Sequence, residues 1–193
     1  MLVFRKLLAH ETGCLTQHLQ RLDAADRRLR FGHFVTSEVI ATYVASIHWP
    51  QTWVVGAFDG DTLRGVAELR PCGPSAARQA ELSVTVERGY QNRGIGTRLL
   101  EEALLIARNR AFETLYLLCL PENMRMQHIA RKLGDLIRFH DGDVEARIKN
   151  PHPDLLSLLT EVFGDGLVFW QAAWKAASHV APEPAPLKLP LVP

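Results

Sequence analysis

The spacing of hydrophobic and polar positions changes several times along the chain, and each change predicts a different element. Residues 2–7 are mostly apolar and predict a first strand. Between residues 11 and 29, Leu15, Leu19 and Leu22 recur among arginines and aspartates, a period that predicts one amphipathic helix. A second helix is predicted to begin at Thr36-Ser37-Glu38, because a hydroxyl side chain can cap it and an apolar face follows over residues 39–47.

The middle of the chain then takes on strand character. Residues 52–58 and 63–69 are rich in β-forming side chains and flank Asp59-Gly60, a dipeptide typical of tight hairpin turns. Residues 81–86 follow with apolar and polar positions in strict alternation. We therefore expect a hairpin followed by a third, half-buried strand.

Helix and strand patterns alternate in the next part of the chain. The predicted elements are a long helix over 94–110, an apolar strand over 114–120 that is buried on both faces, a helix over 123–133 closed by Gly134, and a hairpin formed by 136–139 and 144–148 around Asp141-Gly142. The whole order is β, α, α, β, β, β, α, β, α, β, β. This order predicts an α+β fold with a mixed, mostly antiparallel sheet flanked by helices, not a doubly wound sheet.

A shift in composition at residue 150 predicts where the main domain ends. We expect a domain over residues 1–149, a helical appendage over 150–180 and a loose tail over 181–193, where five prolines exclude helix and sheet. In the appendage, Asp154 is predicted to cap a helix that runs through Phe163, breaks at Gly164 and resumes over 167–178. Its many apolar side chains must be buried, against the domain or in a homodimer.

Composition narrows the class of protein. The 193 residues, 47% of them hydrophobic and 22% charged, are typical of a globular chain that can bury a core without disulfides or metals. The 22 basic and 21 acidic residues nearly cancel, which argues against a nucleic-acid partner. No uncharged apolar run approaches the ~20 residues of a membrane span. Three widely separated cysteines suggest reduced thiols and a cytoplasmic location.

The stretch Gln91-Asn92-Arg93-Gly94-Ile95-Gly96-Thr97 is the most informative for chemistry, because it joins a predicted strand to a predicted helix. Its glycines let a ligand approach the backbone, and the first N–H groups of the helix favour an anion there. Arg93 and Arg98 add positive charge. The spacing alone fits either an anion site or a plain tight turn. A Rossmann loop and a P-loop are both disfavoured, since position 99 is Leu and no Gly-Lys-Ser/Thr follows.

This stretch resembles the Q/R-x-x-G-x-G/A motif of the GNAT superfamily of N-acetyltransferases, and the resemblance extends over residues 2–149. It implies a sheet splayed at its central strands, acetyl-CoA as donor substrate and an amine acceptor. The implied coenzyme A contacts fall in three places. The loop Gln91, Asn92, Arg93, Gly94, Ile95, Gly96 and Thr97 holds the pyrophosphate, Val84, Thr85 and Val86 lie beside the pantetheine arm, and Asn123 touches the arm or caps its own helix.

Within the superfamily, two segments are similar to the bacterial protein lysine acetyltransferases of the Pat type. They are Ala80-Glu81-Leu82-Ser83-Val84 and Arg28-Leu29-Arg30-Phe31, and the segment 125–133 is similar as well. Ala130 stands where many members carry a tyrosine proposed as general acid, so an acid at that position is in doubt.

Acetylation requires a neutral amine, and a free alkylamine has a pKa near ~10.4. Glu81 is the predicted catalytic base, and Glu68 on a neighbouring strand is the reserve candidate. The backbone N–H of Val84 or of a nearby residue is the predicted oxyanion donor. Tyr90 and Tyr116 are the candidates for replacing the missing acid.

The sequence therefore predicts an acetyl-CoA-dependent N-acetyltransferase that acts on a primary amine, either a protein lysine or a small molecule. The alternative is a non-catalytic acyl-CoA-binding or sensing domain, which needs Gly94 and Gly96 but not Glu81. No metal site is expected, because the eight histidines show no metal-ligand spacing, and His128 alone lies near the predicted cleft.

Overall fold

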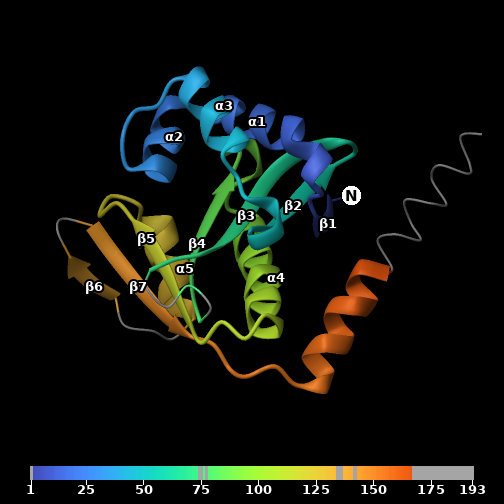
Figure 1. Ribbon diagram of the computed structural model, residues 1–193. Helices are drawn as coiled ribbons and strands as arrows, with labels where there is room; N and C mark the ends of the chain where they lie inside the picture. The colour runs from blue at the N-terminus through green and yellow to red at the C-terminus, as the bar shows by residue number, and fades with distance from the viewer. Residues whose placement is uncertain (1, 74–75, 77, 134–136, 141–142, 167–193) are drawn as a thin grey trace, which may run out of the picture.

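The strands of the computed structural model form one sheet in the order β1-β2-β3-β4-β5-β7-β6 (Figure 1). The structure describes residues 2–73, 76, 78–133, 137–140 and 143–166. Among the strands of the described residues, only the β4–β5 pair is parallel, so the predicted mixed, mostly antiparallel α+β sheet is confirmed. The strands are β1 Leu2–Lys6, β2 Trp53–Asp59, β3 Thr62–Pro71, β4 Gln79–Val86, β5 Thr114–Cys119, β6 Ile137–His140 and β7 Asp143–Lys149.

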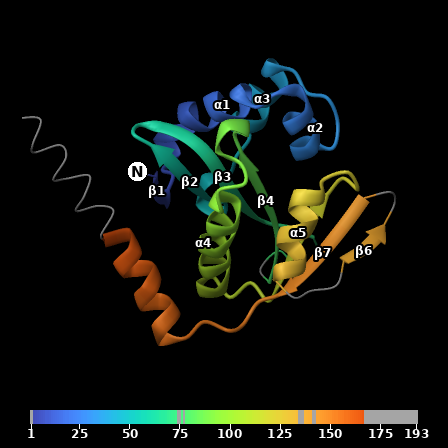
Figure 2. The same cartoon turned by 180° about the vertical axis from the view of Figure 1, so that it is seen from behind.

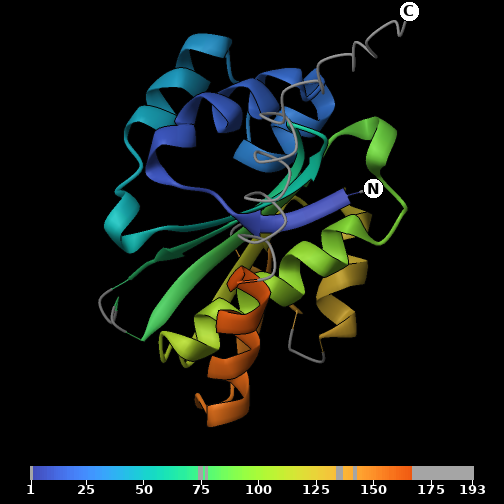
Figure 3. The ribbon, with the colours of Figure 1, turned by 90° about the vertical axis from the view of Figure 1, so that its right-hand side faces the viewer.

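Helices cover both faces of the sheet, as Figure 3 shows from the side. One hydrophobic cluster lies between the sheet and α4, and a second lies between the sheet and the N-terminal helices, with Leu15, Leu19 and Ile40 at its centre. The helices are α1 Thr12–Arg21, α2 Ala24–Phe31, α3 Ser37–Ala45, α4 Ile95–Asn109 and α5 Met124–Lys132, with short 3-10 turns at Ala9–Glu11, Trp49–Gln51 and Arg88–Tyr90.

The single helix predicted over residues 11–29 is wrong, because the chain breaks between α1 and α2. The carboxylate of Asp23 accepts a hydrogen bond of 2.8 Å from the backbone N of Asp26, and its own backbone is extended, as in an N-cap. Leu22 is buried beside the break, so the leucine period continues through it and conceals it. The break lets α2 lie near the β5–α5 connection rather than along α1 (Figure 2).

The two central strands pair over only three positions and then diverge. Gln79, Ala80 and Glu81 pair with Thr114, Leu115 and Tyr116, whereas β4 continues to Val86 and β5 to Cys119 without further pairing. The predicted splay is therefore confirmed. The expectation that β5 is buried on both faces is wrong, because Leu118 is 51% exposed where the partner strand has turned away.

Beyond β7, residues 155–166 form a further helix that lies beside α4 (Figure 3). The Asp154 carboxylate accepts a hydrogen bond of 2.7 Å from Ser157 N, so the predicted cap is confirmed. The predicted break at Gly164 is wrong, since the helix continues to residue 166. The predicted elements over 167–178, the tail over 181–193, Gly134 and the Asp141-Gly142 turn lie outside the described residues.

The domain boundary after residue 149 stays a prediction. In the described part of the chain, no helix has the length and apolar character needed to cross a membrane.

Candidate active site

A cavity of about 590 Å³ opens where β4 and β5 diverge, between α2 on one side and α5 on the other. This volume lies within the range of ordinary small-molecule sites. Ten of the predicted coenzyme A contacts line it: Val84, Thr85, Val86, Gln91, Asn92, Gly94, Ile95, Gly96, Thr97 and Asn123. Tertiary folding thus brings the loop, the strand and the start of α5 together around one space.

The free edge of β4 presents backbone groups to this cavity. At the two ends of the β3–β4 ladder, Gln79 O accepts a hydrogen bond from Cys72 N, and Glu87 N donates one to Arg64 O. Because backbone groups alternate direction in an antiparallel ladder, the intervening even-numbered residues direct theirs to the opposite edge. Beyond Glu81 that edge pairs with no strand among the described residues, so the N–H and C=O of Val84 face the opening.

The loop after β4 is shaped to present amides. Asn92 has φ 59° and Gly94 has φ 77°, both in the left-handed region. Gly94 is the N-cap of α4 and has no side chain to occupy the first-turn N–H groups, so these remain available to an anion. A Cβ on Gly94 would meet nothing within 4 Å, which means that the backbone conformation is what requires glycine here.

Gly96 has a different role. A Cβ at this position would lie 3.5 Å from Ile129 Cδ1 and 3.9 Å from Val84 Cγ1, so glycine widens the gap between β4 and α5. The loop amides and this narrow gap together fit an anionic group attached to a slender chain, which is the chemistry of coenzyme A.

The side chain of Gln91 braces the loop. Its Nε2 donates to Val86 O at 2.9 Å and to Asp26 Oδ2 at 3.1 Å, and its Oε1 accepts from Arg125. Asp26 is 9% exposed and lines the cavity. Sequence reasoning missed Asp26, because its spacing on a short helix is that of an ordinary solvated carboxylate.

The positive charge near the cavity comes from unexpected elements. Arg93 lies outside the lining, with its guanidinium 5.4 Å from the Tyr90 ring centroid, and Arg98 pairs with Glu102 at 2.7 Å. Four basic side chains of the described residues line the cavity: Arg30 on α2, which pairs with Glu68, and Arg125, His128 and Lys132, which form one stripe of α5. The spacing of three and four residues along α5 was the sequence signal that could have identified this stripe.

Asn123 caps its own helix, as predicted, and its contact with the coenzyme A arm stays a prediction. Its side chain accepts a hydrogen bond of 3.2 Å from Met126 N and so caps α5, and the residue also lines the cavity.

Glu81 lies at the apex of the opening. It is the last β4 residue in register with β5, where it stands opposite Tyr116, and on β3 it stands opposite Arg70. Ala80 and Leu82 enter the core under α4, so the half-buried Glu81 side chain lies on the other face of the sheet. It is not part of the cavity lining, whereas Ser83 on the same face is.

The reserve candidate Glu68 is occupied by other side chains. It is 1% exposed, and its oxygens accept hydrogen bonds from Arg30 at 2.8 Å, Tyr43 at 2.8 Å and Arg70 at 3.1 Å. Burial opposes its ionisation, but the two arginines and the hydrogen bonds more than offset this and hold the pKa of Glu68 below its usual range. A carboxylate with a lowered pKa that already accepts three hydrogen bonds is a weak base.

The two candidate acids differ in availability. The Tyr90 hydroxyl donates to Asp59 Oδ2 at 2.7 Å, and this hydrogen bond raises the pKa of Tyr90, which disfavours proton release. Tyr116 stands opposite Glu81 on the same sheet face. Ala130, at the position of the family tyrosine, is buried against the core.

A buried polar network supports the end of β4. His18 is fully buried, with Nε2 2.9 Å from Thr85 Oγ1 and Nδ1 3.3 Å from Glu87 Oε1. Arg21 and Arg64 each donate to Glu87 at 2.8 Å. Burial opposes ionisation of Glu87, but the hydrogen bonds from His18, Arg64 and Arg21 prevail and lower its pKa to about 2. Among the described residues, no group of three or more His, Cys, Asp or Glu side chains is placed to hold a metal ion.

Comparison with known protein families gives one match over most of this region. The description of the matching family is "Acetyltransferase (GNAT) family", and the match covers residues 17–135.

Solved structures show the same fold at low sequence identity. The GNAT domain of S. lividans PAT is 18% identical, with TM-score 0.66, covering 76% of this chain and 89% of that one. The yncA protein of Salmonella typhimurium, solved with its cofactor acetyl-CoA, is 13% identical, with TM-score 0.60 and coverage of 80% and 99%. The paiA N-acetyltransferase of Thermoplasma acidophilum, in complex with coenzyme A, is 19% identical, with TM-score 0.59 and coverage of 77% and 99%.

Proposed function

Because this chain belongs to the GNAT acetyltransferase family, we propose that it transfers the acetyl group of acetyl-CoA to a primary amine and uses Glu81 as the catalytic base. Acetyl-CoA is the donor substrate of this family. The observation that supports this proposal is the opening between β4 and β5. The amide loop and the free edge of β4 line the cavity there, and the Glu81 carboxylate lies where the two strands separate.

The donor is held along the cavity. The first-turn N–H groups of α4 and the loop from Gln91 to Thr97 bind the pyrophosphate, because their partial charges complement an anion. The backbone of Val84 at the free edge of β4 hydrogen-bonds the amides of the pantetheine arm, as an added strand would, and Thr85 and Val86 lie beside the arm. Asn123 contacts the arm from the far side.

Glu81 takes the proton of the amine, directly or through a water molecule. The neutral amine nitrogen then forms a bond to the thioester carbon, and the Val84 N–H stabilises the charge on the carbonyl oxygen. The nitrogen gives up its surplus proton to solvent, and the C–S bond breaks with its electrons on sulfur. A thiolate with a pKa near ~8.5 is a good leaving group, so the reaction needs an acid less than an alkoxide would. Tyr116 is the candidate for returning a proton to it.

Glu81 is favoured over Glu68 by what each carboxylate contacts. Glu68 is surrounded by two arginines and a tyrosine that keep it ionised and occupied. Glu81 stands half-buried at the point where the strands separate, so an acceptor that reaches the thioester from that face meets it. The acceptor is a protein lysine or a small primary amine.

The test compares Glu81→Gln with the wild-type chain between about pH 6 and pH 9, at saturating acetyl-CoA and with a panel of peptide lysines and small amines. Loss of a general base lowers the rate by ~10²–10⁴ at neutral pH, and the deficit shrinks as the amine becomes neutral by itself. The control is Glu113→Gln, which changes an exposed carboxylate paired with Arg78.

An unchanged rate and pH profile in Glu81→Gln would exclude this residue as the base. Tight binding of coenzyme A without turnover of any amine in the panel would support the alternative function, an acyl-CoA-binding or sensing domain.

A further inference from the structure

The helix at residues 155–166 is amphipathic, but unlike an ordinary surface helix it buries polar side chains and exposes apolar ones. Ser157 and Glu161 face the body of the protein and are buried, with 4% and 8% exposure. Its large apolar side chains point outward instead, with exposures from 42% to 73%: Leu155, Leu156, Leu158, Leu159, Val162 and Phe163. A monomeric domain normally places such a face against its core.

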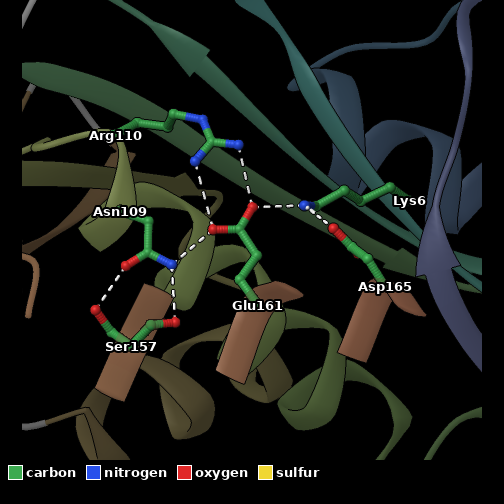
Figure 4. Close-up of polar contacts among 6 residues, drawn as sticks. All are labelled: Lys6, Asn109, Arg110, Ser157, Glu161 and Asp165. Carbon is green, nitrogen blue, oxygen red and sulfur yellow. Dashed lines mark hydrogen bonds and ion pairs between the residues drawn. The ribbon is translucent and has the colours of Figure 1, made fainter. Parts of the chain in front are cut away.

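Polar contacts hold the helix in this orientation (Figure 4). The Glu161 carboxylate accepts hydrogen bonds from Lys6 on β1, from Asn109 at 2.6 Å and from Arg110 at 3.1 Å. Ser157 Oγ donates to Asn109 Oδ1 at 2.6 Å, and Asp165 pairs with Lys6 at 2.7 Å. These contacts, most of them partly buried and charge-assisted, fix the side of the helix that meets β1 and α4.

The outward face is continuous. Leu155, Leu159 and Phe163 recur every four residues and form a stripe directly opposite Ser157 and Glu161, and the other three apolar residues flank it. Scattered apolar side chains on a surface are ordinary, but a contiguous apolar helix face marks a contact surface.

The charges on the helix exclude two kinds of partner. Its ionised residues are acidic, namely Glu161 and Asp165, with Asp154 at the cap, and Arg108 pairs with Asp154. Helices that lie on anionic lipid carry basic residues beside the apolar face, and nucleic acid also requires basic contacts. The occupant is therefore an uncharged apolar protein surface.

We propose that the occupant is the same helix of a second copy, so that two chains form a symmetric dimer through residues 155–166. A two-fold contact requires a self-complementary patch, and an uncharged apolar stripe meets this condition. The six side chains together expose on the order of several hundred Å², close to the ~800 Å² that each partner contributes to a standard stable interface.

The dimer leaves the donor cavity accessible. The helix lies beside α4 (Figure 3) and contacts β1 through Lys6, whereas the lining of the cavity comes from β4, β5, α2, α5 and the start of α4. The interface is thus independent of acetyl-CoA binding.

The test is sedimentation of the full chain from about 1 to about 100 µM, a range in which interfaces of this size associate. The expected result is reversible formation of a species of twice 21.6 kDa. Leu159→Lys places two like charges at the centre of the stripe and should shift the chain to monomer. Thr160→Lys is the matched control, with the same charge on an exposed position outside the stripe, and should remain dimeric.

Circular dichroism and binding of coenzyme A check that each variant is folded. A wild-type chain that stays monomeric over the whole range overturns the proposal and assigns the face to residues 167–193 of the same chain or to another protein. A Leu159→Lys variant that still dimerises also overturns it, because the contact would then lie elsewhere.

Discussion

The side-chain amide of Gln91 donates a hydrogen bond of 3.1 Å to the carboxylate of Asp26, and this contact joins segments 65 residues apart in the chain. The same amide also donates to Val86 O, so Gln91 ties the end of β4 to α2. The Gln91 side chain thus holds the amide loop against α2 and the end of β4.

Gln91→Glu is expected to weaken coenzyme A binding by roughly tenfold, because it places two carboxylates within hydrogen-bond distance and pushes the loop away from α2. Adding Asp26→Asn should recover most of the affinity by restoring a donor and an acceptor. Isothermal titration with coenzyme A measures both. A double variant as weak as Gln91→Glu alone would mean that the Gln91–Asp26 contact does not position the loop.

The two loop glycines are expected to respond differently to alanine. Gly94→Ala should lower the melting temperature, since a left-handed backbone costs an L-residue about 1–2 kcal/mol. Gly96→Ala should leave stability unchanged or raise it, because alanine favours helix, yet weaken coenzyme A binding by filling the gap toward Ile129. Thermal melts and titration separate the two effects, and equal losses of stability would contradict this assignment.

Glu87 predicts a pH dependence of stability. Its pKa is about 2 in the folded chain and 4.5 as an ordinary carboxyl, so its contribution to stability is full above the ordinary value and is lost as pH falls toward 2. Glu87→Gln should therefore melt below the wild type at pH 7, and the difference should narrow between about pH 5 and pH 2. Melting curves across this range test the prediction, with Glu113→Gln as the exposed control; a constant difference would refute it.

Glu161→Gln is expected to loosen the C-terminal helix without affecting the cavity. The substitution leaves Lys6 and Arg110 facing a neutral amide in a buried contact, so hydrogen exchange over residues 155–166 should accelerate by about tenfold, and exchange in the core of α4 should not. Asp165→Asn should have a smaller effect, because Asp165 is 51% exposed. Equal protection in both variants would show that Glu161 does not anchor the helix.

Local patterns predicted most of the fold. The hairpin at Asp59-Gly60 and the long helix α4 follow from short-range periodicity and turn chemistry, and they occur as predicted. The strand β4 also occurs, but its predicted alternation ends at Ser83, because Thr85 is buried and Val84 is only half-buried. The break between α1 and α2 was not predicted, because Leu22 is buried whether the helix continues or ends there. Only the capping geometry of Asp23 reveals the break.

The amide loop was also accessible from the sequence, since a left-handed glycine before a helix is a local requirement of the backbone. The different environments of Glu81 and Glu68 could not be read from the local sequence. Both are strand carboxylates with similar neighbours in sequence, and only strand register and the approach of Arg30 from α2 decide that one is enclosed while the other stands at the splay.

By itself, the sequence determined the strand–loop–helix unit that cradles an anion, because glycine conformation and helix N–H groups depend on residues adjacent in the chain. Only the tertiary structure decided that Asp26 braces this loop, that α2 and α5 supply the basic side chains of the cavity and that the helix at residues 155–166 exposes its leucines. Burial, charge pairing and hydrogen bonding between distant segments arise from packing, and packing is a property of the whole fold.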